Sequence, residues 1–352
     1  MHNGATHSRI HAGRASLAQT GTGWQQQMRE AITDADTLFA LLDLPRAHLP
    51  AARRAARTFP LQVPRALAAR MRPGDIDDPL LRQVLPLDAE CDAVPGFVAD
   101  AVGDTASAAG DGLLHKYHGR ALIVTTGACA INCRYCFRRH FDYAAHNGAR
   151  RRWHSVIERI AADDSIAEVI LSGGDPLSLA DSKLGALTEQ LADIQHVRRL
   201  RIHTRQPVVL PARIDAAFLR LFAAIPQQCI VVIHANHANE LDAQVARALA
   251  RLRANGALLL NQSVLLRGVN DDADALAALS ERLFDCGVLP YYLHLLDRVA
   301  GTAHFEVPAE RAEALMQTIA ARLPGYLVPK LARETAGAPA KSVIGYRFPA
   351  DD

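Results

Sequence analysis

The sequence predicts an α/β protein, an incomplete (βα)6 barrel of TIM-like type preceded by a helical N-terminal region. Short β-rich runs alternate with amphipathic helical segments after residue 112, which favours parallel strands joined by right-handed crossovers. The runs at 169–171 and 230–233 are continuously apolar, as in a sheet covered on both faces. Six such units fall short of the eight of a complete barrel. A doubly wound open sheet remains the alternative.

The chain is expected to divide into four parts. Residues 1–23 are predicted to be a disordered tail, and 24–110 a helical region that ends in a linker rich in small residues. In the helical region, Thr33 or Asp34 is expected to cap a helix over 36–43. Residues 111–330 form the predicted barrel. Residues 331–352 form a C-terminal segment.

The elements of the barrel follow from local periodicity. The predicted strands are 121–126, 168–172, 200–204, 230–234, 258–265 and 291–295. Amphipathic helices are predicted at 181–194, 240–254 and 272–286. Functional residues should gather at the C-terminal ends of the strands, because barrels carry their active sites there.

Composition excludes several classes of protein. The 39 basic and 37 acidic residues leave a net charge of +2, too small for the field on which non-specific nucleic-acid binding depends. No run of eighteen apolar residues and no signal-peptide pattern occurs, so we expect a cytoplasmic protein that binds neither nucleic acid nor membrane. Three of the six cysteines cluster within eight residues, which indicates metal binding in a reducing compartment.

The clustered cysteines lie directly after the first predicted barrel strand, in Cys129-Ala-Ile-Asn-Cys133-Arg-Tyr-Cys136. Three thiolates leave one iron of a [4Fe-4S] cubane without a protein ligand, so that iron can bind a small molecule. A structural zinc site normally closes with four ligands, and no second cysteine pair is present, although His140 offers a fourth ligand. The motif favours the cluster, and a zinc-binding interaction protein is the alternative. The other arginines of the basic run from Arg134 to residue 152, apart from Arg138, are expected to form a solvated face.

The cysteine spacing, with Tyr135 before the third cysteine, resembles that of the radical S-adenosylmethionine (SAM) superfamily, and the resemblance implies that Tyr135 is a cofactor-binding residue. The resemblance implies a barrel of the radical SAM type, in which SAM binds the open iron and is cleaved to a 5'-deoxyadenosyl radical. The segment Ser172, Gly173, Gly174 and Asp175 resembles the superfamily's GGD-type segment, which binds the methionine amino group.

Longer segments resemble the lysine 2,3-aminomutase family over about residues 113–341. They are 136–139, 171–175, 204–211, 234–240 and 261–270. The resemblance implies an isomerase that converts L-α-lysine to (R)-β-lysine by moving the amino group from C2 to C3. It also implies three cofactors, which are a [4Fe-4S] cluster, SAM and pyridoxal 5'-phosphate.

The resemblance implies roles for residues around pyridoxal phosphate. Lys341 matches the family's lysine that holds this cofactor as a Schiff base, although Gly337-Ala-Pro-Ala-Lys341 replaces a run of glycines. Lys116, Tyr117 and Arg120 match the segment that binds the cofactor phosphate.

Further residues match the positions that bind substrate and SAM. Arg138 matches the clamp for the substrate carboxylate, and a guanidinium suits bidentate carboxylate binding. Asp297 and Glu334 match the pair that binds the ε-ammonium, with Glu334 standing where the family has Asp. His234 and Gln262 match positions that contact SAM or pyridoxal phosphate.

The short C-terminus, with eleven residues after Lys341, resembles the bacterial branch that makes (R)-β-lysine for elongation factor P. This branch implies L-lysine as substrate, an external one-electron reductant, and a functional link to elongation factor P and its β-lysine ligase. A catabolic lysine mutase, or a mutase acting on another amino acid, is the alternative of the same class. The oligomeric state stays open between monomer and homo-oligomer.

Overall fold

One mostly parallel sheet organises the chain. The computed structural model describes residues 23–104, 112–143 and 150–346, so the predicted tail up to residue 22 and most of the predicted linker lie outside the described residues. The strands are β1 (Leu113–Tyr117), β2 (Arg120–Thr126), β3 (Glu168–Gly173), β4 (Arg199–Thr204), β5 (Gln228–Ile233), β6 (Leu258–Val264), β7 (Leu289–His294), β8 (Lys330–Arg333) and β9 (Ser342–Val343). They lie in sequence order across the sheet; β2 to β8 pair in parallel, and β1 and β9 pair antiparallel at its two ends.

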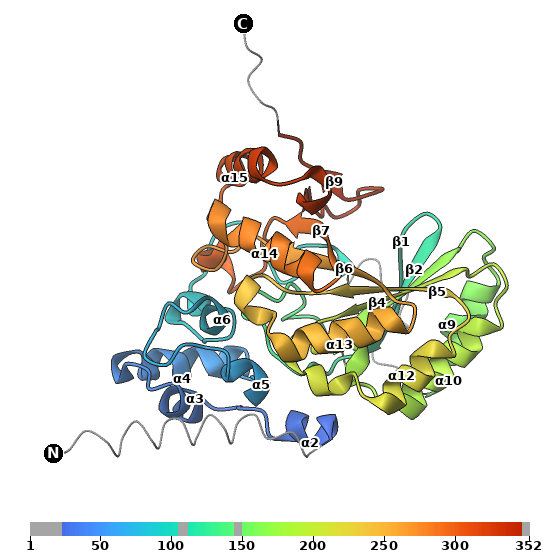
Figure 1. Cartoon of the computed structure of the whole chain (residues 1–352), viewed down its shortest axis with the longest axis horizontal. Coiled ribbons are helices and arrows are strands. Elements are labelled where there is room, and N and C mark those ends of the chain that lie inside the picture. The colour runs from blue at the N-terminus through green and yellow to red at the C-terminus, as the bar shows by residue number, and fades with distance from the viewer. Residues whose placement is uncertain (1–22, 105–111, 144–149, 347–352) are drawn as a thin grey trace, which may run out of the picture.

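Each connection between successive parallel strands carries a helix. The main helices are α9 (Arg150–Ala161), α10 (Asp181–Ala192), α12 (Ala216–Ala223), α13 (Ala243–Ala254), α14 (Ala273–Asp285) and α15 (Ala309–Arg322), with the short α11 (Gln206–Val209) before α12. Figure 1 shows α10, α12 and α13 along one side of the sheet. The strand order never reverses, whereas a doubly wound sheet requires a reversal. The predicted incomplete (βα)6 barrel is therefore confirmed, and the open-sheet alternative is wrong.

Local signals define where the helices begin and end. The carboxylates of Asp215, Asp242 and Asp272 accept hydrogen bonds from the first backbone N–H groups of α12, α13 and α14. Gly256 and Gly287 follow α13 and α14 with φ of 91° and 73°, a conformation that glycine adopts without a Cβ penalty. These capping residues thus set the points at which the helices begin and end.

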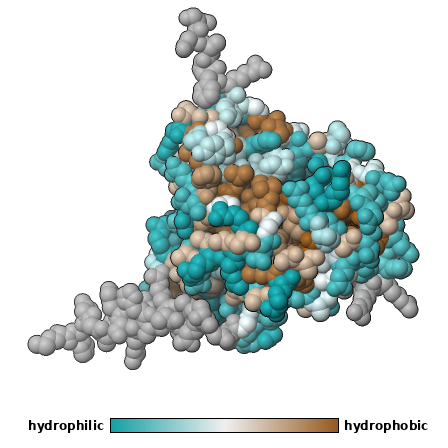
Figure 2. Space-filling model, turned by 45° about the vertical axis from the view of Figure 1, so that its right-hand side comes forward, coloured by the Kyte–Doolittle hydropathy of each residue, from teal (hydrophilic) through white to brown (hydrophobic). Residues whose placement is uncertain are grey.

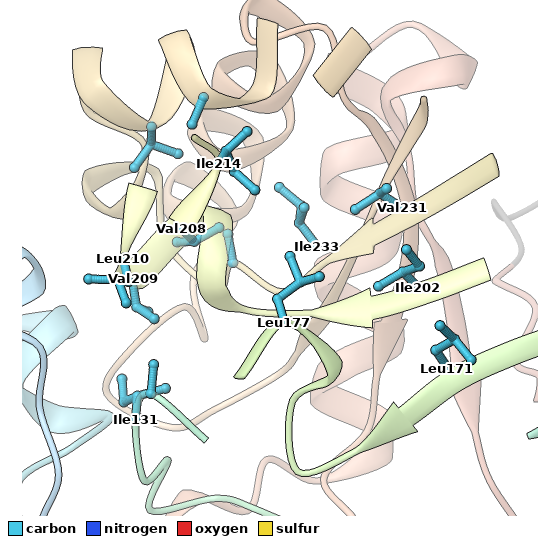
Figure 3. Packing of buried hydrophobic residues seen from close by; sticks show 14 of the residues in the cluster. Ile131, Leu171, Leu177, Ile202, Val208, Val209, Leu210, Ile214, Val231 and Ile233 are labelled. Atoms are coloured by element: carbon cyan, nitrogen blue, oxygen red, sulfur yellow. The ribbon is translucent and has the colours of Figure 1, made fainter. Parts of the chain in front are cut away.

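The barrel core lies between the sheet and its helices. Leu171, Ile202 and Val231 pair with one another across β3, β4 and β5 and are almost fully buried. Figure 3 shows them on successive strands, with Val208 and Ile214 from the segment after β4 belonging to the same hydrophobic cluster. Close packing of branched side chains on both faces of the sheet stabilises it.

The N-terminal region is helical, as the sequence predicts. It contains α2 (Trp24–Arg29), α3 (Ala35–Leu41), α4 (Leu49–Thr58), α5 (Arg65–Ala68) and α6 (Pro79–Arg82). Asp34, and not Thr33, caps α3 by accepting from the backbone N–H of Thr37. Leu38 and Met71 belong to the same buried cluster as the barrel strands, so this region packs on the barrel through one continuous core.

One face of the molecule is mostly polar. Figure 2 shows this largely hydrophilic face with a hydrophobic area near its centre. Among the described residues, no helix is both long and apolar enough to cross a membrane.

Candidate active site

The C-terminal ends of the parallel strands open onto a cavity of about 480 Å³. Every candidate site residue derived from the sequence lines it, from the cysteines near β2 to Lys341 beside β9. Their separation in sequence reaches more than two hundred residues, and the order of the strands brings them to one place. Their individual roles stay predictions.

The N-terminal region forms hydrogen bonds with the cysteine loop, residues 127–140. The Gln62 side chain donates from Nε2 to the carbonyl of Cys129 at 2.8 Å, and the backbone N–H of Asn132 donates to the Gln62 carbonyl at 3.0 Å. The N–H of Arg134 donates to the carbonyl of Gln83 at 2.9 Å. These backbone contacts define the path of the loop, so the N-terminal region shapes the place where the thiols meet the cavity.

Two arginines of this loop are buried, which corrects the expectation of a solvated face for Arg134 and Arg139, while the side chains at 150–152 lie outside the described part of the structure. Arg134 donates from Nε to Oε1 of Glu90 at 2.8 Å, and Arg139 donates from Nη2 to Oε2 of Glu90 at 2.9 Å. Both guanidinium groups also stand over the Phe59 ring, at 4.9 and 4.7 Å. Glu90 lies 44 residues before Arg134, so no local pattern marks it as the partner. A buried charge of this kind needs such a partner.

The glycine pair at the end of β3, Gly173 and Gly174, allows the backbone to approach the start of the cysteine loop. Gly173 has φ of 119°, and a Cβ there would stand 2.6 Å from the carbonyl oxygen of Thr126. A Cβ on Gly174 would stand 2.5 Å from the carbonyl oxygen of Ala128. Any side chain at either position would push the cysteine loop away, so both glycines are sterically required.

The Asp175 carboxylate joins the ends of β3 and β4 through hydrogen bonds. It accepts hydrogen bonds from the Leu177 N–H at 3.0 Å, the Thr204 hydroxyl at 2.7 Å and the Arg205 N–H at 2.8 Å. Burial raises the pKa of Asp175 to about 6, although these hydrogen bonds act in the opposite direction. The carbonyl of Gly173 beside it accepts from the Tyr143 hydroxyl at 3.0 Å.

A buried polar network under Cys133 was not predicted. Arg205 donates to Sγ of Cys133 at 2.8 Å, to Oε2 of Glu240 at 2.8 Å and to Oε1 of Gln83 at 2.6 Å. Asn236 donates to the same Gln83 oxygen at 3.0 Å. Arg205 and Glu240 lie shortly after apolar strands, in segments that carry the family resemblance. The sequence signal that could have identified this network is the charged residue just beyond the end of each of these two apolar strands.

Three histidines lie at the ends of β4, β5 and β7. Burial lowers the pKa of His234 to about 3 and holds those of His203 and His294 well below their ordinary value, so all three imidazoles are neutral. Within the described part of the chain, Nε2 of His203 and Nε2 of His234 have no hydrogen-bond partner. Buried polar atoms without partners fit a site that receives a polar cofactor.

Five charged residues of alternating sign form a continuous series along the cavity wall. Glu334 pairs with Lys341 and with Lys116 through N–O distances of 3.4 Å each. Asp104 pairs with Lys116 at 2.5 Å and with Nε of Arg138 at 2.6 Å. We call Lys341, Glu334, Lys116, Asp104 and Arg138 the ion-pair series. Asp104 was predicted to lie in a linker, yet it is buried between two candidate anion ligands.

Charge and burial set the protonation of the groups beside this series. Burial, with the neighbouring Glu334 charge, raises the pKa of Asp297 to about 7. Burial also lowers the pKa of Lys341, against the attraction of Glu334 and Asp297. Burial would lower the pKa of Arg138, but the carboxylate of Asp104 holds it above its ordinary value. Arg138 is therefore charged, and the amine of Lys341 loses its proton more easily than a solvated lysine.

The donor set fits the three implied cofactors. All three loop cysteines are free thiols that line one cavity, and a cubane binds each thiolate to a different iron. The described residues contain no group of three or more His, Cys, Asp or Glu side chains that could hold a single metal ion. The mostly buried Lys341, with Lys116 of β1 and Arg120 of β2 in the same cavity, fits a phosphorylated aldehyde.

Comparison with known proteins gives the family. The family model of the radical SAM superfamily matches residues 123–279. L-lysine 2,3-aminomutase of Escherichia coli is 50% identical over 322 residues, covering 91% of this chain and 94% of the relative. The Haemophilus influenzae enzyme of the same name is 45% identical over 320 residues, covering 91% and 95%. The Clostridium subterminale enzyme is 29% identical over 322 residues, covering 91% and 77%. This chain belongs to the lysine 2,3-aminomutase family of the radical SAM superfamily.

Proposed function

We propose that this chain is an isomerase that converts L-α-lysine to (R)-β-lysine with a [4Fe-4S] cluster, SAM and pyridoxal phosphate. The observation that carries the proposal is one cavity lined by the three cysteines, Lys341 and the acidic pair Asp297 and Glu334. The 50% identity to the Escherichia coli L-lysine 2,3-aminomutase supports the reaction and the substrate.

The cofactors supply chemistry that no side chain has. The β C–H bond of lysine is not acidic enough for a side-chain base, so the cluster and SAM supply a radical, and pyridoxal phosphate supplies a π-system for the migrating nitrogen. Cys129, Cys133 and Cys136 would hold the cluster. The segment Ser172, Gly173, Gly174 and Asp175 lines the same cavity and would bind the amino acid end of SAM.

The protein's part around pyridoxal phosphate is to hold and orient it. Lys341 would bind the aldehyde as a neutral amine, which its lowered pKa favours. Lys116, Tyr117 and Arg120 would bind the phosphate, and the Arg120 guanidinium already stands 4.6 Å from the Tyr117 ring centroid. His234 would donate or accept a hydrogen bond through its unpartnered Nε2.

The remaining residues orient the substrate and the cysteine loop. Arg138 would bind the lysine carboxylate, with its guanidinium kept in place by Asp104 and by Ser172 Oγ at 3.2 Å. Gln262, from β6, lines the cavity where it would contact a cofactor. The Tyr135 ring packs edge-on against the Phe305 ring, with their centroids 6.2 Å apart, and this contact supports the cysteine loop.

One experiment tests the reaction. The anaerobically reconstituted protein is incubated with L-lysine, SAM and dithionite, and the products are separated by chirality. We expect (R)-β-lysine from lysine and no β-amino acid from glutamate. Absence of β-lysine from protein that carries both the cluster and pyridoxal phosphate would overturn the proposal. A colourless protein that takes up zinc instead of a brown iron protein would favour the zinc alternative.

The cofactor lysine has its own test. Borohydride reduction of the loaded protein should trap the cofactor on the peptide that contains Lys341, and Lys341→Ala should retain the cluster but lose the trapped cofactor. The matched variants are Lys330→Ala and Lys183→Ala, which should trap it normally. A cofactor trapped on Lys330 or Lys183 would contradict the assignment.

We also propose that the product modifies elongation factor P, so that the enzyme works in the cytoplasm with a one-electron reductant and precedes the β-lysine ligase. The higher identity to the Escherichia coli relative than to the Clostridium subterminale relative supports this branch. A Glu in place of Asp at position 334 supports a pocket that turns over free lysine slowly, because a misplacement of ~1 Å can cost about a hundredfold in rate. A deletion strain should contain elongation factor P that lacks the β-lysyl mass. Fully modified factor in that strain would refute this role.

A further inference from the structure

Glu334 already has ion-pair partners within the chain itself. Its carboxylate pairs with Lys341 through Oε2 and with Lys116 through Oε1, at 3.4 Å each, and burial together with the nearby Glu334 charge raises the pKa of the Tyr117 phenol to about 12. These three neighbours are residues that the proposed function gives to pyridoxal phosphate. The side chains of Lys341, Glu334 and Lys116 are only 23%, 19% and 16% exposed, so water competes weakly with these contacts.

Lys116 has no donor left for a phosphate. An ammonium has three N–H donors. The Lys116 nitrogen lies 2.8 Å from the carbonyl oxygen of Val102, 2.5 Å from a carboxylate oxygen of Asp104 and 3.4 Å from Oε1 of Glu334, which makes one oxygen for each N–H. The contact with Glu334 is the longest of the three. A phosphate that binds Lys116 would therefore replace Glu334 first.

We propose that Glu334 is held by the cofactor-binding residues until pyridoxal phosphate engages them, and that only then is its carboxylate free to bind the terminal ammonium of the substrate. The inference rests on the proposed function. When the Lys341 amine condenses with the cofactor aldehyde, a carbon–nitrogen bond forms and water leaves, so no oxidant or reductant is required. Lys341 then no longer offers Glu334 an ammonium, and the phosphate takes its place on Lys116 and Tyr117.

Asp297 supplies the contrast that makes this testable. Asp297 lies close enough for the Glu334 charge to affect it, yet in the described structure no lysine or arginine lies within 4 Å of its carboxylate. Above about pH 7, where its carboxyl is ionised, Asp297 should therefore bind an ammonium with or without the cofactor, and the affinities are compared at pH 8. Glu334 should do so only in the loaded protein. The two carboxylates of one pocket thus differ in whether they depend on the cofactor.

The probe is 6-aminohexanoate, which has the carboxylate and the terminal ammonium of lysine but no α-amino group to react with the cofactor. Its affinity is measured by anaerobic titration calorimetry on cluster-containing protein with and without pyridoxal phosphate. The probe carries one negative and one positive charge. The charge of the cofactor phosphate therefore repels the carboxylate of the probe and attracts its ammonium, and these two effects on its affinity oppose each other. We expect the cofactor to tighten binding about tenfold in the natural protein, within the usual range of coupling between two sites.

The variants separate the roles. Glu334→Gln should bind the probe equally with and without the cofactor, while Glu334→Asp should keep a ratio above one. Asp297→Asn should bind it more weakly in both states and keep the ratio. Glu306→Gln, which breaks an exposed pair with Arg298 outside the cavity, should behave as the natural protein.

The inference is overturned if the natural protein binds the probe equally in both states, or if Glu334→Gln keeps the tenfold ratio. Borohydride trapping and lysine turnover are measured on the same preparation. If no cofactor is trapped on Lys341, the proposed function fails. If trapping and turnover are normal while the ratio is one, only the inference about Glu334 fails.

Discussion

The guanidinium of Arg134 donates from Nε to Oε1 of Glu90 at 2.8 Å, and both side chains are fully excluded from water. Arg134 belongs to the cysteine loop, and Glu90 ends the helical N-terminal region. The pair therefore joins the region that carries no proposed site residue to the loop that carries the three thiols. The same carboxylate also accepts from Arg139, so removal of the Glu90 charge leaves two buried cations that keep only backbone carbonyls as hydrogen-bond partners.

Glu90→Gln is expected to lower the free energy of unfolding by about 3 kcal/mol, because breaking a buried ion pair leaves an uncompensated charge. Urea denaturation of the cofactor-free protein measures the change. Asp88→Asn, which breaks an exposed pair with Arg54, is the matched control and should have little effect. Equal midpoints for the two variants would contradict the account of Glu90.

Gly174→Ala should impair cluster assembly more than folding. Its Cβ would stand 2.5 Å from the carbonyl oxygen of Ala128, so the cysteine loop must move. Iron and sulfide per chain after reconstitution should fall severalfold, while the circular dichroism spectrum stays native. Gly325→Ala, where a Cβ meets no atom within 4 Å, should load normally. Full iron content in Gly174→Ala would show that the loop tolerates the shift.

Cys133→Ala should abolish the visible absorbance of the cluster and the reductive cleavage of SAM. Two remaining thiols cannot hold three irons of a cubane. Cys229→Ala, a buried cysteine outside the loop, is the matched control and should keep both properties. Iron content and released 5'-deoxyadenosine are measured. Retention of both in Cys133→Ala would exclude Cys133 as a ligand.

Asp297 should make the stability of the cofactor-free protein depend on pH. Burial and the charge of Glu334 raise its pKa from 3.8 to about 7, so between about pH 4 and 7 the folded chain holds a proton that the unfolded chain releases. This stabilising contribution is complete below pH 4 and is lost as pH rises through 7. Thermal unfolding at pH 5 and pH 8 should show Asp297→Asn gaining stability relative to the natural protein at the higher pH. A constant difference between the two proteins would contradict the raised pKa.

Much of the fold was predictable from local pattern. All six predicted barrel strands are present, because each is an apolar run of ordinary length bounded by turn residues. The parallel strand β8 was missed, since Lys330–Arg333 has only four residues with charged residues at both ends. The antiparallel strands β1 and β9 were missed for a related reason. Neither carries the continuous apolar run that marks a strand inside the barrel.

The candidate site was likewise only partly predictable from the sequence. The sequence by itself determined the cysteine motif and the glycine pair Gly173 and Gly174, since each depends on neighbours in the chain. The tertiary structure decided the order of the strands that carries them to one edge, because a doubly wound sheet fits the same alternation of elements. Only the tertiary structure decided the partners of the buried charges. Asp104 lies 34 residues from Arg138, and Glu334 lies 218 residues from Lys116. A buried ion pair is set by which side chains packing brings together away from water, and no periodicity along the chain records that choice.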